Sequence, residues 1–410
     1  MTFLYIDPGT GSMLFSLALG VATTLVFAIR ALAVKLRFVF SGGKANKISS
    51  EKIPFVIFSD HKRYWNVFKP ICDEFERRKI PLVYYTQSAD DSALSEKYEF
   101  VKAEFIGEGN KGFVRMNMLN AGTVLSTTPG LDVLQWKRSK NVERYVHIPH
   151  TLDEMGGYRM FALDFYDTVI ATGKNQEELV REIESLRPTI KRKEIAIVGS
   201  PYMDRNLARV KNLPPHVQDK ESPVVLFAPS WGESGSLAKF GEKMLSMLVA
   251  TGFKIIIRPH PQTVQSEKAI LSPLMEKYKN SVEWNFDNDN LAVMSRADIL
   301  ISDFSGIMLE FAMLFNRPVM YRNSENNDYS VYDYAWIDHE KWMFLATGKY
   351  GVQFSEKDFP NFKELILKAI ESPEIEKGIQ EIKSECWENI GGAAKSAVDF
   401  LTKMEEKKHD

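Results

Sequence analysis

The stretch "RADILISDFSGIMLEFAMLFNRPVMYR", residues 296–322, decides the fold of this chain of 410 residues. A short apolar run, Ile299 to Ile301, ends in the small and hydroxyl residues 302–306, and a helical pattern follows at once. A second apolar run, residues 317–322, comes after the helix. Small residues between a buried strand and a helix tend to leave backbone N–H groups free to bind an anion. The stretch therefore predicts a strand, a turn able to hold a phosphate, a helix and another strand.

The helix in this stretch carries one acid, Glu310, on an otherwise apolar face. A carboxylate in the first turns of such a helix is placed to accept hydrogen bonds from a ribose diol. A plainer interpretation makes Ser302 or Asp303 a helix cap, which stabilises a helix by roughly 1 kcal/mol. Capping accounts for one residue and leaves Glu310 unexplained, so the sequence favours a nucleotide-binding turn.

Short apolar runs alternate with amphipathic stretches along the chain, which predicts parallel, doubly wound sheets. A first series of predicted strands covers residues 54–60, 80–86, 122–130, 144–150, 167–173 and 194–201. A second series covers residues 223–232, 254–261, 281–286, 298–303 and 317–322. We therefore expect an α/β protein with two Rossmann-like domains facing a cleft. Ligands of such sheets bind beyond the carboxyl ends of the strands.

The same pattern predicts five parts of the chain. Residues 1–50 form a membrane anchor and a polar spacer, and residues 51–206 form an N-terminal Rossmann-like domain. Residues 207–222 are polar, contain two adjacent prolines and read as a linker. Residues 223–385 form a C-terminal Rossmann-like domain, and residues 386–410 form a C-terminal helix. This last helix is the end of one long helix that the pattern predicts from about residue 362 to residue 406.

The bulk composition limits the classes of function. A hydrophobic content of 44% and a charged content of 26% are typical of a folded protein. The formal net charge is -2, so the protein has no overall positive charge, and nucleic acid is not expected as a partner. Cys72 and Cys386 form neither a metal-binding spacing nor a disulfide framework, and they fit a reducing compartment. No acidic cluster with magnesium spacing is visible, so we expect no metal.

The N-terminus differs from everything after it. Residues 13–29 contain no charge, and basic residues follow at positions 30, 35, 37, 44 and 47. A bilayer core needs about 20 apolar residues, with roughly 17 as the lower limit. Basic residues on the C-terminal side predict an outside N-terminus and a cytoplasmic body. We expect a single-pass anchor in the plasma (inner) membrane. A helix lying on the membrane surface, or buried in the protein, is the alternative.

Two of the seven histidines, His150 and His260, stand at the ends of predicted strands, one in each domain. An imidazole titrates near pH 6.5 and serves as a general acid or base near neutral pH. A lone histidine is more often structural, but matching positions in two facing domains favour a shared site. His147 is the fallback base, although strand alternation places it out of phase with His150.

Several blocks, in order over roughly residues 140–330, resemble the CDP-glycerol glycerophosphotransferases, the teichoic-acid primase and polymerase group of bacterial wall-polymer enzymes. "YVHIPHTLDEMGGYRMFALDFYDTVIATG" is similar to the family block around a catalytic histidine, and "GSPYMD", "LFAPSWG" and "IIRPHP" are similar to shorter family turns. "NDNLAVMSRADILISDFSGIMLEFAMLFNRPVMY" resembles the block in which Ile-Thr-Asp-Tyr-Ser-Ser precedes an acidic helix. Thr151 departs from the glycine usual after the first histidine, and Tyr202 and Gly232 replace usual arginines.

The resemblance implies a GT-B-like, membrane-anchored transferase that needs no cofactor. It would move glycerol phosphate, or a related alditol or sugar phosphate, from a CDP-activated donor to a hydroxyl of a lipid-linked acceptor, releasing CMP. His150 is then the general base for the acceptor, and His260 assists the leaving phosphate. The residues predicted to bind the donor are Ser230, Arg258, Ser302, Asp303, Ser305, Gly306 and Glu310. The oligomeric state is not predicted.

Two other classes stay open. "SDFSGIMLE" and "RPHP" also resemble motifs of the UDP-sugar 2-epimerases, so a GT-B sugar-nucleotide enzyme, either an epimerase or a glycosyltransferase, is possible. Against an epimerase, the acidic pair of that family is reduced to Glu310. The third class is a non-catalytic membrane scaffold, which the replaced arginines favour.

Overall fold

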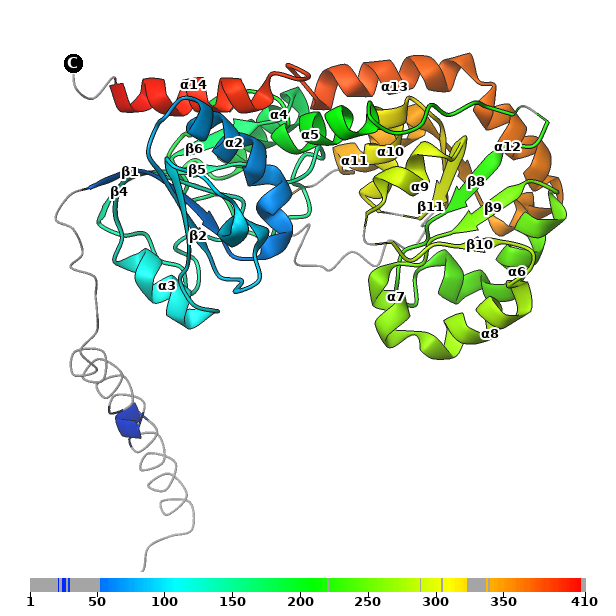
Figure 1. Cartoon of the computed structure of the whole chain (residues 1–410), viewed down its shortest axis with the longest axis horizontal. Helices are drawn as coiled ribbons and strands as arrows, with labels where there is room; N and C mark the ends of the chain where they lie inside the picture. The colour runs from blue at the N-terminus through cyan, green and yellow to red at the C-terminus, as the bar shows by residue number, and fades with distance from the viewer. Residues whose placement is uncertain are drawn as a thin grey trace, which may run out of the picture. The chain divides into compact units, whose positions relative to one another are not determined.

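The computed structural model describes residues 52–219, 221–287, 289–303, 305–322 and 340–406, together with residues 21, 24–26, 29 and 337. The chain divides into two compact units, Met1–Lys52 and Ile53–Asp410, and the second contains two parallel sheets (Figure 1). Most of the predicted anchor, residues 13–29, lies outside the described residues. Among the residues that are described, no helix has the length and apolar character that crossing a membrane requires.

The N-terminal sheet has seven parallel strands in the order β3-β2-β1-β4-β5-β6-β7. Its strands are β1 (Ile53–Ser59), β2 (Leu82–Thr86), β3 (Val101–Phe105), β4 (Asn120–Ser126), β5 (Asn141–His147), β6 (Thr168–Ala171) and β7 (Glu194–Ile197). The helices between them are η1 (Lys62–Tyr64), α2 (Trp65–Arg77), η2 (Ser92–Ser95), α3 (Asn110–Asn117) and α4 (Lys174–Leu186). Helix α5 (Pro201–Val210) follows β7.

Strand β1 shows why these sequences form buried strands. Phe55 and Ile57 belong to a hydrophobic cluster that includes side chains of α2, whereas Val56 and Phe58 belong to a second cluster that includes side chains of α3 and α4. Successive side chains of a strand point to opposite faces, so a strand covered on both faces reads as a continuous apolar run. This is the reason that the apolar runs of the sequence located most strands.

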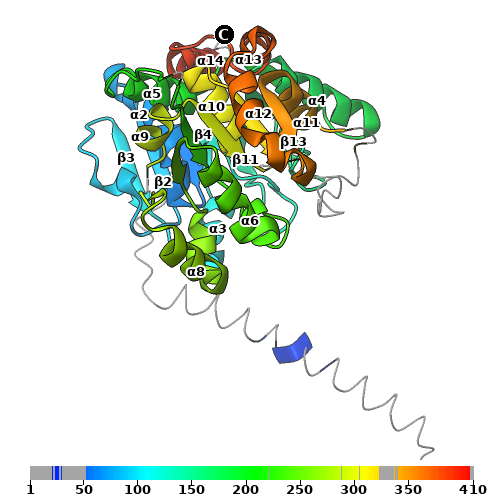
Figure 2. The ribbon, with the colours of Figure 1, turned by 90° about the vertical axis from the view of Figure 1, so that its right-hand side faces the viewer.

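The C-terminal sheet has six parallel strands in the order β10-β9-β8-β11-β12-β13. Its strands are β8 (Val224–Phe227), β9 (Lys254–Ile257), β10 (Glu283–Trp284), β11 (Ile299–Ser302), β12 (Val319–Arg322) and β13 (Gly351–Phe354). Its helices are α6 (Ser236–Ala250), α7 (Pro261–Ser266), α8 (Lys268–Tyr278), α9 (Leu291–Ser295), α10 (Ile307–Phe315), α11 (Trp342–Tyr350), η3 (Glu356–Asn361) and α12 (Phe362–Ile370). Figure 2 shows α11 and α12 beside β13. The predicted α/β class with two parallel sheets is confirmed.

The long helix predicted from residue 362 to residue 406 is wrong, because the structure has three helices there. Helix α13 (Pro373–Cys386) begins at a capping serine, Ser372, followed by Pro373, and proline cannot continue a preceding helix. Helix α14 (Ala393–Glu406) follows two glycines, and Gly391 has a φ of +83° that interrupts helical geometry.

The C-terminal helices join the two halves of the second unit. Helix α13 packs against α11 and α4, and α14 returns to the N-terminal half, where it packs against α2, α5 and β4 (Figure 1). Helix α5 extends to Val210, so the beginning of the predicted linker, residues 207–222, is helical. It also contacts α9 and α10 of the C-terminal half.

Candidate active site

Each sheet places one histidine at the same relative position. Strand β5 ends at His147 and β9 ends at Ile257, so His150 and His260 each lie three residues beyond a strand end, directly after a proline. Because both sheets are parallel, each histidine lies at the carboxyl edge of its own sheet, where ligands of α/β proteins bind. That the two imidazoles meet over one substrate stays a prediction.

The surroundings of His150 suit a general base. The side chain is partly buried, and its ring stands edge-on to the ring of Tyr64 with the centroids 5.0 Å apart. Burial lowers the pKa of His150, and the charge of Arg63 acts in the same direction, while Asp153 and Asp60 oppose the shift. The imidazole is therefore neutral at neutral pH, as proton abstraction requires.

His147, the fallback base, is a core residue instead. Its side chain is fully buried, with Nε2 lying 3.2 Å from the hydroxyl of Tyr158 and the ring edge-on to Tyr166. Burial lowers the pKa of His147 to about 3. Strand β5 ends at His147, so alternation does not extend to His150, and the burial of His147 leaves an acceptor no access to this ring.

His260 is oriented by the backbone of the helix that it precedes. Its Nδ1 accepts a hydrogen bond of 3.1 Å from the amide of Gln262, and its ring stacks on Trp231 at a centroid distance of 6.3 Å. Burial lowers the pKa of His260, while Glu267 opposes the shift. Because Nδ1 accepts, the neutral ring carries its proton on Nε2, which can donate to a phosphate oxygen.

Asp303 organises the turn that follows β11. Its carboxylate accepts hydrogen bonds from the amides of Ser230 (2.9 Å) and Ser236 (3.0 Å) and from the Ser236 hydroxyl, and Arg322 Nε lies 3.7 Å away. The side chain is 2% exposed. Burial raises the pKa of Asp303, against the effect of these hydrogen bonds. In the structure this carboxylate ties the loop after β8 to the end of β11.

Two other residues predicted to bind the donor also make internal contacts. The buried hydroxyl of Ser302 donates to the carbonyl of Ala228 at 2.6 Å, which joins β11 to the end of β8. The guanidinium of Arg258 donates to the side chain of Asn285 and to the carbonyl of Asp287 (2.7 Å). These contacts shape the carboxyl edge of the C-terminal sheet, and direct donor binding by Ser302 and Arg258 stays a prediction.

The start of α10 is open. Gly306, which precedes the helix, is exposed, and no atom of the described residues lies within 4 Å of the position that a Cβ would take. Its φ of -55° is ordinary, so the backbone does not require glycine here. Ser305 is partly exposed, and its hydroxyl accepts a long contact of 3.4 Å from the Ile307 amide. A phosphate can therefore approach the positive end of this helix.

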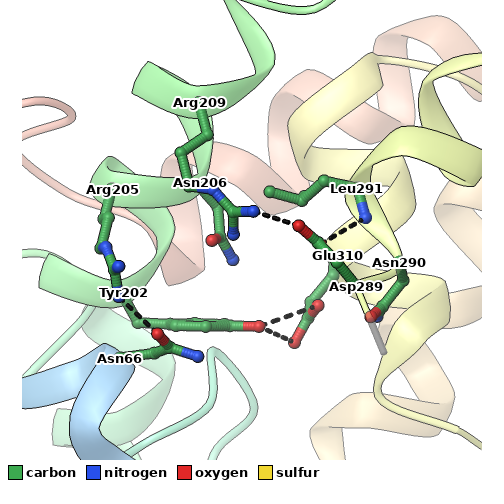
Figure 3. Close-up of a pocket in the computed structure, with 9 residues that line it drawn as sticks. All are labelled: Asn66, Tyr202, Arg205, Asn206, Arg209, Asp289, Asn290, Leu291 and Glu310. Atoms are coloured by element: carbon green, nitrogen blue, oxygen red, sulfur yellow. Dashed lines mark hydrogen bonds and ion pairs between the residues drawn. The ribbon is translucent and has the colours of Figure 1, made fainter. Parts of the chain in front are cut away.

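Glu310 faces a cavity of about 380 Å³ between α5, α9 and α10 (Figure 3). Its carboxylate oxygens lie 3.2 and 3.3 Å from the hydroxyl of Tyr202. Burial raises the pKa of Glu310 to about 7, and the Tyr202 hydrogen bond acts against this shift. Burial and the nearby carboxylate also raise the pKa of Tyr202. The volume lies within the range of small-ligand sites, about 300–1,000 Å³.

Two arginines of α5 line the same cavity. Arg205 donates to the side chain of Asn66, and Arg209 pairs with Asp289 across the cavity (Figure 3). The remaining lining residues are Asn206, Asn290 and Leu291. The cavity thus combines cationic, amide and carboxylate groups from both halves.

The sequence analysis did not predict Arg205, Arg209 or Tyr64 as site residues. It considered Tyr202 only as a position where the resembled family usually has an arginine. A signal was present for each. The two arginines are four residues apart, a spacing that places both side chains on one face if the segment is helical. Tyr64 and Tyr202 follow the carboxyl ends of β1 and β7, the same edge that identified His150. Within the described part of the chain, no group of three or more His, Cys, Asp or Glu side chains could hold a metal ion.

One family model matches the middle of the chain. The family model of CDP-glycerol:poly(glycerophosphate) glycerophosphotransferases matches residues 156–348, which include His260 and the turn after β11 and begin after His150. A comparison with curated protein sequences finds no match.

Solved structures share the fold at low sequence identity. The wall teichoic acid polymerase TagF has a TM-score of 0.58 and 15% identity, covering 94% of this chain and 99% of that chain. A TagF variant soaked with CDPG has a TM-score of 0.58 and 16% identity, covering 89% and 92%. UDP-GlcNAc 2-epimerase from Neisseria meningitidis, bound to UDP-GlcNAc, has a TM-score of 0.53 and 15% identity, covering 86% and 100%. Over residues 156–348 the chain therefore matches the model of the CDP-glycerol:poly(glycerophosphate) glycerophosphotransferase family, in agreement with the resemblance found in its sequence.

Proposed function

We propose that this protein transfers glycerol phosphate from CDP-glycerol to a hydroxyl of a lipid-linked cell-envelope acceptor and releases CMP. The observation that carries the proposal is the open start of α10 next to the cavity that Glu310 faces. The family match over this region supports the choice of a CDP-activated donor. The TagF variant soaked with CDPG supports it by analogy of fold.

The donor is held at the carboxyl edge of the C-terminal sheet. The diphosphate binds at the start of α10, next to Ser305 and Gly306, where a helix N-terminus contributes typically 0.3–1 kcal/mol toward an anion. The Nε2–H of His260 donates to the same diphosphate. Glu310 accepts hydrogen bonds from the ribose hydroxyls inside the cavity, and Arg209 is available to the nucleotide from the opposite wall.

The chemical step is an in-line transfer between two oxygens. The acceptor oxygen forms a bond to the phosphorus that carries the glycerol, and the bond from that phosphorus to the bridging oxygen of the diphosphate breaks. The hydroxyl proton passes to His150, and CMP leaves with its new charge stabilised by His260. A positioned general base contributes about 10²- to 10⁴-fold, which is roughly 3–5 kcal/mol of the barrier.

Membrane attachment belongs to the same proposal. Residues 13–29 are uncharged, and five basic residues follow them. The aliphatic side chains that the structure describes in this segment are helical and exposed, namely Val21 (55%), Leu25 (55%), Val26 (50%) and Ile29 (57%). An apolar helical surface of this kind fits a lipid environment, and the basic residues favour a cytoplasmic body. We place the catalytic unit at the cytoplasmic face of the plasma membrane, close to a lipid-linked acceptor.

One experiment separates this function from its alternatives. The full-length protein, purified in detergent, is incubated with lipid-linked acceptor and, in separate reactions, with CDP-glycerol, CDP-ribitol or UDP-GlcNAc while CMP and UDP are measured. We expect CMP from CDP-glycerol. Release of UDP from UDP-GlcNAc, with no CMP from either CDP donor, would overturn the proposal and favour the sugar-nucleotide class.

Histidine variants test the mechanism. His150→Ala and His260→Ala are each expected to lower kcat/KM by at least 10²-fold. His216→Gln is the matched control, because His216 lies 2.6 Å from Asp298, which precedes β11 at the opposite edge of the sheet. Its CMP release should stay near that of the unsubstituted protein. A non-catalytic scaffold would keep its cellular role in the double variant of His150 and His260.

A further inference from the structure

A second cavity, of about 540 Å³, lies at the amino edge of the N-terminal sheet. Three of its lining residues, Arg138, Asp167 and Lys191, come just before β5, β6 and β7 respectively. His150 lies at the opposite, carboxyl edge of the same parallel sheet. Strand β5 has seven residues, so the two edges are roughly 20 Å apart at about 3.3 Å per residue. The cavity is therefore separate from the candidate active site, and its volume is typical of a small-ligand site.

Two exposed phenylalanine rings form the apolar part of this cavity. Phe161 is 44% exposed and Phe165 is 43% exposed, although both line a concave site. Phe161 has a φ of +69°, a conformation that costs a residue other than glycine roughly 1–3 kcal/mol. Backbone strain of this kind is concentrated at functional sites. The two rings are thus available to a ligand and are not part of the buried core.

A buried carboxylate lies between these two rings in the sequence and lines the same cavity. The side chain of Asp164 is 7% exposed, and its Oδ2 accepts a hydrogen bond of 2.9 Å from Arg187. Its Oδ1 has no hydrogen-bond partner among the residues that the structure describes. Burial raises the pKa of Asp164, against the effect of Arg187. A buried acceptor without a donor costs roughly 1–3 kcal/mol, so a ligand that carries a hydroxyl group would be stabilised here.

The charged groups around the cavity are already paired with one another. Arg138 and Lys191 both pair with Asp167, at 2.9 and 3.5 Å, and Asp164 pairs with its arginine partner. An anionic ligand would have to displace Asp167 from these cations, and a cationic ligand would have to displace an arginine or a lysine. A neutral ligand leaves every pair intact. The cavity therefore fits a neutral molecule that has both an apolar face and hydroxyl groups.

We propose that this cavity binds a neutral mono- or disaccharide at a site separate from catalysis. The C–H face of a sugar ring packs against Phe161 and Phe165, because the faces of aromatic rings carry partial negative charge. A hydroxyl of the sugar donates to Oδ1 of Asp164, and the hydroxyl of Thr189, which also lines the cavity, donates to or accepts from a second one. The inference does not rest on the proposed function, because binding involves neither the donor nor His150.

The test measures sugar binding by the full-length protein in a detergent whose headgroup is not a sugar. Maltose, cellobiose and N,N'-diacetylchitobiose are titrated separately, and binding is followed by saturation-transfer NMR. We expect at least one of them to bind with a millimolar or lower dissociation constant. Phe165→Ala should weaken this binding at least ten-fold. Asp164→Asn should do the same, because the amide places an N–H donor where Oδ1 accepts.

Phe105→Ala is the matched control for the loss of an exposed ring. Phe105 is 40% exposed and ends β3, in the same half of the molecule but outside this cavity. Its alanine variant should bind the saccharide like the unsubstituted protein. The denaturant midpoint of each variant shows whether it is folded. Phe165→Ala removes an exposed side chain, so it tests the site even if Asp164→Asn does not fold.

The outcomes also separate this inference from the proposed function. The absence of binding by all three saccharides, unchanged binding in Phe165→Ala, or equal weakening in Phe105→Ala would each overturn the saccharide site. Displacement of the bound sugar by inorganic phosphate at equal concentration would overturn it as well, because the cavity would then recognise an anion. Saccharide binding that follows the expected pattern in a protein that releases no CMP from CDP-glycerol would keep this site and reject the proposed function.

Discussion

Glu310 is the residue through which pH should act on donor binding. Burial raises its pKa to about 7, so only about one tenth of the molecules carry the carboxylate at pH 6. The ionised form accepts two hydrogen bonds from a ribose diol, whereas the protonated form loses part of that capacity. Affinity for CDP should therefore rise roughly ten-fold between pH 6 and pH 8, measured by calorimetry. Glu310→Gln should bind more weakly and lose this pH dependence.

Tyr202 supplies a second test of the same carboxylate. Its hydrogen bond lowers the pKa of Glu310 from the value that burial alone would give. Tyr202→Phe should therefore move the midpoint of the pH dependence to higher pH without abolishing it. A CDP affinity that is the same at pH 6 and pH 8 in the unsubstituted protein would show that Glu310 does not bind the donor.

Gly306 allows a test of whether a glycine is needed for donor binding and not for backbone conformation. Among the residues that the structure describes, a methyl group at this position meets no atom within 4 Å, and the φ of -55° suits alanine. Gly306→Ala should leave the free energy of unfolding unchanged or raise it by about 0.4–1 kcal/mol. The same methyl would occupy the approach of the diphosphate, so we expect the KM for CDP-glycerol to rise at least ten-fold.

The control for this prediction is Gly252, which also has open space around it but has a φ of +75°. Gly252→Ala should lower the free energy of unfolding, because alanine is strained there, and should leave the KM for CDP-glycerol unchanged. An unchanged KM in Gly306→Ala would place the diphosphate elsewhere.

The sequence located the carboxyl-edge residues but could not assign their contacts. His150 and His260 were found because strand ends can be read from apolar runs. The internal roles of Ser302 and Asp303 could not be read, because they depend on the loop after β8, whose residues 230 and 236 are far away in the sequence. The link between Tyr202 and Glu310 spans the two halves and leaves no local pattern.

At the scale of elements, the strands that the sequence missed are edge strands. Strand β3 ends one side of the N-terminal sheet and β13 ends one side of the C-terminal sheet. Strand β3 has the sequence VKAEF and is mostly exposed or partly exposed, so it shows no apolar run. Edge strands often carry charges that discourage pairing with another chain. An apolar run indicates burial on both faces, and β3 lacks such burial.

The break between α12 and α13 could have been read from Pro373, and the break between α13 and α14 from the glycines at 391–392. The pattern of charged residues alone suggested one long helix, because α13 and α14 each have a similar amphipathic period. The interruption matters, since it lets α14 lie on a different half of the molecule from α12.

Leu401 tests how much α14 contributes to the N-terminal half. It is 2% exposed and belongs to the cluster that contains Phe68 of α2. Leu401→Ala should lower the free energy of unfolding by about 2–5 kcal/mol, measured by denaturant titration with an unchanged m-value. Lys403→Ala, at an exposed position of the same helix, should change it by less than about 0.5 kcal/mol. Equal effects of both substitutions would mean that α14 is not part of this core.

At the scale of the whole molecule, α5 is the joint between the two sheets. Met203 of this helix and Leu152 of the loop after β5 belong to the hydrophobic core of the C-terminal half. Side chains of α14 belong to the core of the N-terminal half. Each half therefore completes the core of the other, and the cavity lined by α5 depends on this arrangement.

Asp204 connects α5 to the segment between α13 and α14, and its substitution should destabilise the packing of α14. Its carboxylate accepts hydrogen bonds from the indole of Trp387 (3.0 Å) and from the amide of Ala393 (2.9 Å), the first residue of α14. Asp204→Ala leaves both donors without this acceptor, which costs about 1–3 kcal/mol for each one that stays buried. We expect faster hydrogen exchange in α14 and α2 and a lower denaturant midpoint. Asp399→Ala removes an exposed ion pair with Arg78 from the same helix and should change neither. If exchange in α14 is the same in Asp204→Ala as in the unsubstituted protein, the helix is held by apolar packing alone, and the cavity does not depend on this carboxylate.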